Sequence, residues 1–436
     1  MFQWKKVFSV ILSSCFIVAG TTGCASIVVQ DLVQQTGNET DNIRNAGMTG
    51  NGTNNTISPV TVAELEVEDA AASATAKLEA KTTSSVMTEN LNKDMESMNA
   101  MDIVKDMRIG WNLGNTLDST RTDLTRLDQP DKFETAWGNP SVKPELIDTI
   151  LDSGFNVIRI PVSWTNHIAP APDYTITESW MKRVKEVVDY AYDKGAYVIL
   201  NIHHEDWNYP YYNNLDVASV QMEAVWKQIA EEFKDYDEHL IFEGQNEPRK
   251  VGTSLEWNGG DAEGWDVVNK LNKVFIDTVR STGGSNPYRM LMIPGYAANC
   301  SVGIKHIEVP ENDNRVIISV HAYEPYDFTL NKNGRNEWQQ DTAAIDNLMR
   351  DLKSLFLDKD IPVIIGEFGA MNKNNESERV KWANYYVSEA KKIDVPCIWW
   401  DNGLFEGDGE RFGLFDRHSY ECKYPDLLVA LLEGTK

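Results

Sequence analysis

One pattern runs through the chain from about residue 97 to its last residue. Short apolar or β-branched runs that end in polar residues alternate with amphipathic stretches, in which apolar residues recur every three or four positions. Eight runs are predicted as strands: Arg108–Asn112, Val157–Pro161, Tyr197–His203, Leu240–Asn246, Arg289–Pro294, Arg315–His321, Pro362–Glu367 and Cys397–Asp401. The predicted helices include Glu178–Asp193, Val220–Phe233, Trp265–Arg280, Thr342–Phe356 and Glu376–Lys391. Eight strand–helix units predict the α/β fold class and a (β/α)₈ barrel over residues 97–436.

The first 24 residues have the pattern of an export signal. Lys5 and Lys6 precede an apolar run over residues 7–20, and small residues then lead to Cys24. This order resembles a bacterial lipoprotein signal, although Thr21 stands where Leu is usual. We predict lipid attachment at Cys24 and a protein anchored to the outer face of a bacterial cell membrane. The alternative is ordinary cleavage near Cys24 and release of a soluble secreted protein.

Residues 25–96 are predicted to be a flexible tether. This stretch holds no Phe, Trp or Tyr, although the whole chain has 14, 13 and 16 of them. A segment without aromatic side chains buries little apolar surface against the entropy cost of ordering it. A small alanine-rich helical module is the rival interpretation.

The charge of the chain argues against one class of partner. There are 66 Asp and Glu against 41 Lys and Arg, which gives a formal net charge of −25. Nucleic-acid binding relies on cationic side chains that neutralise phosphates, so no nucleic-acid partner is expected.

Cys300, Cys397 and Cys422 show no metal-ligand spacing, and the apolar run around Cys397 predicts a buried thiol.

Polar and aromatic residues gather at the ends of the predicted strands. In a (β/α)₈ barrel the carboxyl ends of all strands meet at one face, where active sites lie. Buried polar groups are costly unless they are satisfied, so their concentration at one end predicts a site. The residues concerned are Asn112, Asn115, Arg159, His203, His204, Asn246, Glu247, His321, Tyr323, Glu367 and Trp400.

Glu247 and Glu367 indicate the chemistry, because the fourth and seventh strands lie roughly across the ring from one another. Two carboxyl groups across a cleft suit glycoside hydrolysis, in which one protonates the leaving oxygen and the other attacks or activates water. A separation of about 5–5.5 Å would give retention of configuration and about 6.5–9.5 Å inversion, which the sequence leaves open. Arg159 would keep one glutamate ionised, and a less solvated Glu247, held before Pro248, could keep its proton.

Longer motifs occur in order at barrel spacing. They include Gly-Trp-Asn-Leu-Gly-Asn-Thr at 110–116 and Asn-Glu-Pro at 246–248. Others lie at 135–140, 156–164, 201–204, 321–323, 365–369 and 399–403. Together they resemble glycoside hydrolase family 5 of the clan A barrels. The first motif and the Trp-Gly-Asn-Pro element at 137–140 are similar to those of the bacterial subfamily 4 endoglucanases, lichenases and xyloglucanases.

The resemblance implies roles for individual residues. It implies a retaining mechanism in which Glu247 is the acid/base and Glu367 the nucleophile. Arg159 and Tyr323 would hydrogen-bond around the nucleophile, and His321 would support the acid/base.

The resemblance also implies a set of substrate contacts. Asn246 would hold the 2-hydroxyl of the cleaved sugar, and Trp400 would stack beneath its ring. Flat indole faces stack on sugars, so two loop tryptophans are expected to bind as well. The substrate-binding residues are predicted to be Asn112, Trp137, Arg159, His203, His204, Trp207, Asn246, His321, Tyr323 and Trp400.

Several nearby groups have structural interpretations. Glu243 is expected to be a hydrogen-bonded structural carboxylate, and Glu205 and Asp206 are expected at the cleft rim or in solvent. His203 and His204 are neighbours on a predicted strand, so their side chains should point to opposite sides, and no third ligand has suitable spacing. No metal ion in catalysis and no organic cofactor are therefore expected.

The sequence thus predicts a monomeric, secreted, retaining endo-β-1,4-glucanase that acts on plant cell-wall glucans. Endo-xyloglucanase, lichenase or mannanase activity remains an alternative on the same barrel. A non-catalytic surface glycan-binding protein is the remote alternative. Contact with the membrane is expected only through the N-terminal lipid.

Overall fold

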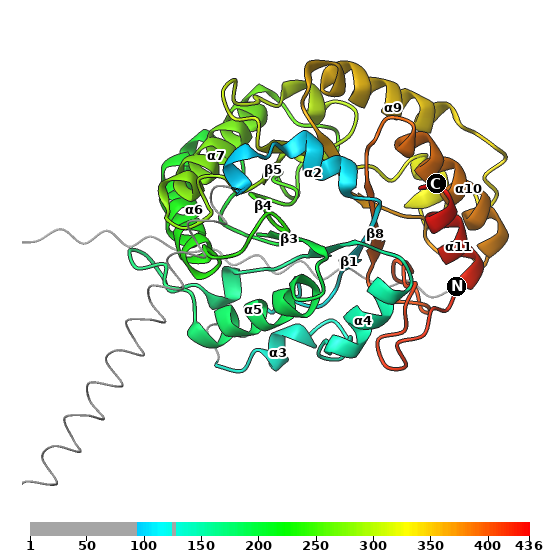
Figure 1. Ribbon diagram of the computed structural model, residues 1–436, viewed down its shortest axis with the longest axis horizontal. Coiled ribbons are helices and arrows are strands. Elements are labelled where there is room, and N and C mark those ends of the chain that lie inside the picture. The colour runs from blue at the N-terminus through cyan, green and yellow to red at the C-terminus, as the bar shows by residue number, and fades with distance from the viewer. Residues whose placement is uncertain (1–93, 124–127) are drawn as a thin grey trace, which may run out of the picture. The chain divides into compact units, whose positions relative to one another are not determined.

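The computed structural model describes residues 94–123 and 128–436, which form a closed parallel barrel surrounded by helices (Figure 1). The strands are β1 Ile109–Leu113, β2 Val157–Ile160, β3 Tyr197–Asn201, β4 Leu240–Glu243, β5 Leu291–Asn299, β6 Val316–His321, β7 Val363–Phe368 and β8 Cys397–Asp401. They follow chain order around the ring, and β1 pairs with β8 to close it. The predicted (β/α)₈ barrel is confirmed.

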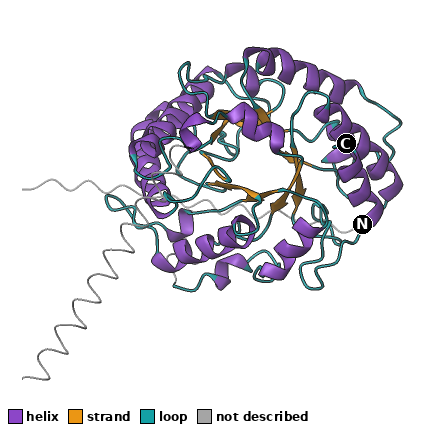
Figure 2. Ribbon diagram, viewed as in Figure 1, coloured by secondary structure: helices purple, strands orange, loops and turns teal. Residues whose placement is uncertain are grey.

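Most of the helices lie outside the ring of strands, as Figure 2 shows in purple and orange, and one short helix lies across an end of the barrel. The helices are α2 Ala100–Asp106, α3 Asp131–Glu134, α4 Pro144–Asp152, α5 Glu178–Tyr192, α6 Tyr212–Glu232, α7 Ala262–Ser281, α8 Tyr326–Thr329, α9 Ala343–Leu355, α10 Glu376–Lys391 and α11 Pro425–Glu433. The apolar stripe predicted on α5 is buried. The helices α4 and α11, absent from the sequence prediction, each begin with a proline, which is favoured in a first helical turn.

Apolar side chains fill two layers of the fold. A large cluster joins the outer faces of the strands to the helices. A second cluster fills the barrel at the amino ends of its strands, and α2 closes this end with Ala100, Ile103, Val104 and Met107. The barrel interior is therefore packed from below, and its opposite end carries the polar residues.

The predicted N-terminal segments cannot be placed on this fold. The signal segment, Cys24 and the tether up to residue 93 lie outside the described residues. Within the described part of the chain, every helix is too short or too polar to cross a membrane.

Candidate active site

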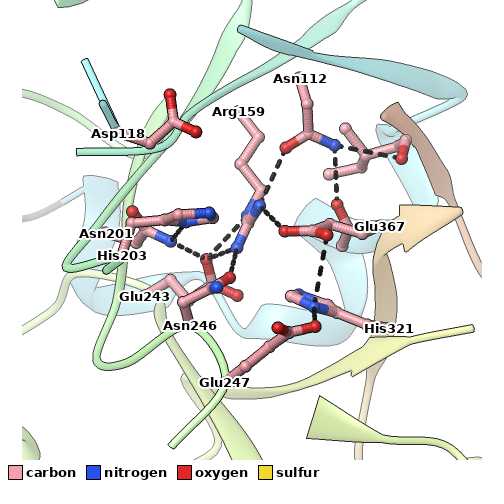
Figure 3. A network of polar contacts seen from close by, with 12 residues as sticks. Asn112, Asp118, Arg159, Asn201, His203, Glu243, Asn246, Glu247, His321 and Glu367 are labelled. Carbon is pink, nitrogen blue, oxygen red and sulfur yellow. Dashed lines mark hydrogen bonds and ion pairs between the residues drawn. The ribbon is translucent and has the colours of Figure 1, made fainter. Parts of the chain in front are cut away.

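Two glutamates meet at the carboxyl end of the barrel. Glu367 lies within β7, and Glu247 follows β4 by four residues. An oxygen of each carboxyl group and a ring nitrogen of His321, the last residue of β6, all lie within 4.8 Å of one another (Figure 3). The strands thus bring together two residues that are 120 positions apart in the sequence. This approach is nearer to the separation of about 5–5.5 Å that gives retention than to the 6.5–9.5 Å that gives inversion.

Glu367 is held by two donors. Nη1 of Arg159 donates to its Oε1 at 2.8 Å, and the hydroxyl of Tyr323 donates to its Oε2 at 3.0 Å. Both donors favour the ionised carboxylate. The glutamate that the sequence left open as the partner of Arg159 is therefore Glu367.

Arg159 is fully buried and organises the floor of the site (Figure 3). Its guanidinium also donates to Glu243 at 2.7–2.8 Å, to Oδ1 of Asn112 at 2.9 Å and to Oδ1 of Asn246 at 2.8 Å. Glu243 is fully buried and accepts further bonds from Asn201 and Ser319, as the structural interpretation of this carboxylate predicted.

Asn112 is a support for Arg159 and does not line the cleft. Its side chain is fully buried, and its Nδ2 donates to backbone carbonyls of β7 and β8. The prediction that Asn112 contacts the substrate is therefore wrong, because its side chain has no exposed surface. The strand register explains this outcome, since Asn112 pairs with Arg159 one layer below the strand ends.

Glu247 has a hydrogen-bond partner that can gain or lose a proton. Nδ1 of His321 lies 2.9 Å from its Oε1, and Nη1 of Arg249 lies 3.6 Å from its Oε2. Burial acts to raise the pKa of Glu247, but the hydrogen bond and charge of His321, together with the charges of Arg249 and His204, lower that pKa. Burial acts to lower the pKa of His321, but the negative charges of Glu367 and Glu247 raise it above 6.5.

The pKa of Glu367 is shifted in the opposite direction to that of Glu247. Burial raises the pKa of Glu367 above 4.5, against the positive charges of His321 and Arg159. The hydrogen bonds from Arg159 and Tyr323 favour the ionised form of Glu367 against this effect of burial, and the hydrogen bond between His321 and Glu247 can carry a shared proton. When that proton lies on Glu247, this residue can act as an acid.

His203 and His204 do not alternate as a strand predicts. Because β3 ends at Asn201, both lie beyond it, and their rings are only 4.4 Å apart. Potential ligand atoms of both histidines and of Asp118 lie within 4.8 Å of one another, so the sequence missed a third candidate metal ligand. No spacing signal pointed to Asp118.

The hydrogen bonds of Asn201 argue against a metal ion in this cluster. Its Oδ1 accepts from the backbone of Val162, so its Nδ2 must face both Glu243 and Nδ1 of His203. Nδ1 of His203 then accepts, and the ring proton lies on Nε2, which leaves no free lone pair for a metal ion. Burial lowers the pKa of His203 well below 6.5, so the neutral ring offers one N–H donor to the cleft.

A cavity of about 920 Å³ lies above the glutamates. Of the residues predicted to bind substrate, it is lined by Trp137, His203, His204, Asn246, His321, Tyr323 and Trp400. The ring of Trp400 lies parallel to that of His203 at 5.9 Å, and Trp137 leans on His204 at 5.5 Å. Two further residues that the sequence did not assign to the site, Arg249 and Glu410, also line it.

Trp207 differs from its predicted position. It does not line the cavity; it packs against the hydrophobic core, and its Nε1 donates to Oε2 of Glu205 at 2.7 Å. Glu205 is buried, and its Oε1 accepts from the backbone of Trp164. It lines a second cavity that also borders His204 and Glu247, so it lies at the cleft rim, one of its two expected positions. Burial raises the pKa of Glu205 to about 8. Only Asp206 is exposed, as expected.

A (β/α)₈ barrel that brings two carboxyl groups so close at its carboxyl end has the site geometry of a glycoside hydrolase. The comparison with protein families agrees: the model of the family described as Cellulase (glycosyl hydrolase family 5) matches residues 117–406. The chain belongs to this family.

Relatives with known names extend the comparison. Endoglucanase B of Neocallimastix patriciarum is 51% identical over 347 residues, which cover 79% of this chain and 73% of that protein. The solved structure of a GH5-4 broad specificity endoglucanase from Ruminococcus champanellensis, with bound cellotriose, is 45% identical with a TM-score of 0.75. It aligns with 77% of this chain and 98% of its own. A xyloglucan-specific endo-β-1,4-glucanase from a metagenomic library, in complex with cellotriose, is 42% identical with a TM-score of 0.73, over 76% and 98% of the two chains.

Proposed function

We propose that this chain is an endo-β-1,4-glucanase that cleaves internal bonds of plant cell-wall glucans with retention of configuration. The observation that carries the proposal is the pair Glu247 and Glu367, each of which places one carboxyl oxygen within 4.8 Å of the other's in a family 5 barrel. An inverting enzyme needs about 6.5–9.5 Å to seat a water molecule between its carboxyl groups. The names of the relatives support β-1,4-glucan as the substrate class.

The first step forms a covalent intermediate. An oxygen of the Glu367 carboxylate attacks the anomeric carbon, and the bond from that carbon to the glycosidic oxygen breaks. Glu247 gives its proton to the departing oxygen, so the shortened chain leaves as an alcohol. Arg159 and Tyr323 hold the attacking carboxylate in place through the bonds described above.

The second step releases the sugar. Glu247, now ionised, takes a proton from a water molecule as the water oxygen attacks the anomeric carbon. The ester bond to Glu367 breaks, and two inversions give net retention. His321 supports the return of the proton, because its Nδ1 remains 2.9 Å from Glu247.

The preferred polymer depends on the walls of the cleft. One solved relative is described as of broad specificity and another as xyloglucan-specific, although both bind cellotriose. We propose a β-glucan chain as the ligand. Xyloglucan, mixed-linkage glucan and mannan are the polymers against which unsubstituted β-1,4-glucan must be ranked.

The test is the release of reducing sugar from carboxymethylcellulose, barley β-glucan, xyloglucan and glucomannan, with Glu367→Ala as the control. We expect activity on at least one glucan and none in the control. Binding of cello-oligosaccharide without any cleavage over a day would instead support the non-catalytic glycan-binding alternative.

We also propose that the enzyme is exported and anchored by lipid at Cys24, which rests on the sequence pattern alone. Mass spectrometry of the membrane fraction should then find a diacylated Cys24 at the mature N-terminus. An unmodified N-terminus in the culture medium would reject the anchor.

A further inference from the structure

The loop after β8 places one acidic residue in the cleft. It carries Glu406, Asp408 and Glu410 within five positions. The side chain of Asn402 holds the base of this loop, with its Oδ1 accepting from the backbone of Leu404 and its Nδ2 donating to the carbonyl of Glu410 at 2.7 Å. Of the three acidic residues, Glu410 is the one that lines the main cavity.

The carboxylate of Glu410 has no compensating cation. Among the residues that the structure describes, no Lys or Arg forms an ion pair with it, whereas Glu367 has Arg159 and Glu247 has Arg249. Burial raises the pKa of Glu410, and the negative charges of Glu247 and Glu367 raise it further. Its charge is therefore close enough to the catalytic pair to act on what the cleft holds.

The cavity as a whole carries an excess of negative charge. Its charged lining comprises Glu247, Arg249, Glu324, Glu367 and Glu410. The one cation of this set, Arg249, already faces Glu256 at 3.3 Å as well as Glu247 at 3.6 Å. A carboxylate carried by a sugar would thus meet like charge, and the one guanidinium among these lining residues is already paired.

We propose that Glu410 makes the cleft selective by charge, so that neutral β-glucans are preferred over glucans that carry carboxylate substituents. This inference rests on the proposed function. Like charges in a partly desolvated cleft repel more strongly than in bulk water, and repulsion of the wrong partner is a common source of specificity. Screening by salt should weaken the effect.

The experiment compares hydroxyethylcellulose, which is neutral, with carboxymethylcellulose, which is anionic. The measured quantity is kcat/KM on the anionic polymer divided by kcat/KM on the neutral one, at low and at high ionic strength. We expect Glu410→Gln to raise this ratio about threefold at low ionic strength and to have little effect at high ionic strength. Asp408→Asn removes a charge from the same loop outside the cavity lining and should leave the ratio unchanged.

Three results would overturn the inference. One is an unchanged ratio in Glu410→Gln while both polymers are cleaved. Another is an equal loss on both polymers, because Glu410 would then bind the sugar chain itself. The third is an equal rise in the ratio for Asp408→Asn, which would assign the effect to net charge. If the native enzyme cleaves none of the neutral glucans, the proposed function fails first.

Discussion

Glu247 and Glu367 differ in their partners, and this difference supports the roles that we propose for them. Glu367 accepts from a guanidinium that stays charged at every working pH, so it stays ready to attack. Glu247 shares a hydrogen bond with an imidazole, which can give and take a proton. The two glutamates are thus distinguished by their hydrogen bonds, which come from a guanidinium for Glu367 and involve an imidazole for Glu247.

This assignment predicts opposite products from two alanine variants supplied with azide and an aryl β-cellobioside. In Glu367→Ala, azide attacks from the vacated face, expels the aryl oxide directly and gives the α-glycosyl azide. In Glu247→Ala, azide intercepts the glycosyl ester on Glu367 and gives the β-glycosyl azide. Without azide both variants should lose about 10³-fold or more in turnover on polymeric glucan, which nuclear magnetic resonance and rate assays would measure. Exchange of the two products would reverse the roles.

The pH dependence of kcat/KM should report the titration of Glu367 and of the hydrogen-bonded pair His321 and Glu247. Activity is lost as the pH falls through the raised pKa of Glu367, because a neutral carboxyl group cannot attack. Activity is lost again as the pH rises through the raised pKa of His321, because the proton for the leaving oxygen is then gone. The acid limb is therefore expected above 4.5 and the alkaline limb above 6.5.

The variant His321→Gln tests the alkaline limb. Glutamine can still donate a hydrogen bond to Glu247 but stores no proton, so the alkaline limb should move to lower pH. An alkaline limb that stays in place would assign it to another group.

Arg159→Lys should reduce both activity and stability. Lysine keeps the charge but has no planar fork with which to reach Glu243, Glu367, Asn112 and Asn246 together. We expect kcat to fall about 10²-fold as the nucleophile loses its orientation, and the free energy of unfolding to fall by about 3 kcal/mol. Arg183→Lys is the control, because Arg183 makes a comparable forked contact with Glu134 at 2.8–3.0 Å away from the site. Its kcat should be unchanged.

At the scale of elements, the positions at which the strands end explain why some predictions for residues near those ends were wrong. The paired part of β3 ends at Asn201 and that of β4 at Glu243, two and three residues before the predicted ends. Alternation along a strand therefore did not apply to His203 and His204, and their rings converge. Sequence periodicity locates the strands but not the last hydrogen-bonded pair, which depends on the neighbouring strand.

The strands β1, β2 and β8 approach one another closely at Gly110, so we expect Gly110→Ala to lower the stability of the barrel. A Cβ atom at this position would lie 2.8 Å from Cγ2 of Ile398 and 3.0 Å from Cβ of Val157. Overpacking of this kind should lower the free energy of unfolding by about 1–3 kcal/mol, as denaturant titration would measure. Gly283→Ala is the matched control, because a Cβ atom there would meet nothing within 4 Å. Equal stability of the two variants would contradict the packing of the barrel.

At the scale of the whole molecule, the barrel and the meeting of the two glutamates at its carboxyl end could be predicted because they depend on patterns within the chain. Eight alternations of strand and helix define the ring, and the ring brings Glu247 and Glu367 together. Contacts made by loops could not be predicted this way. The positions of Trp207, Asp118 and Glu410 depend on how loops fold over the barrel, and no periodicity encodes this.

The proposed mechanism is a double displacement on a β-1,4-glucan. The most direct test is hydrolysis of cellopentaose followed from the first turnover by proton nuclear magnetic resonance. We expect the β anomer of the new reducing end to appear first and the α anomer to follow only by mutarotation. Initial release of the α anomer would show inversion, and would contradict attack by Glu367 and with it the mechanism derived from the geometry of this site.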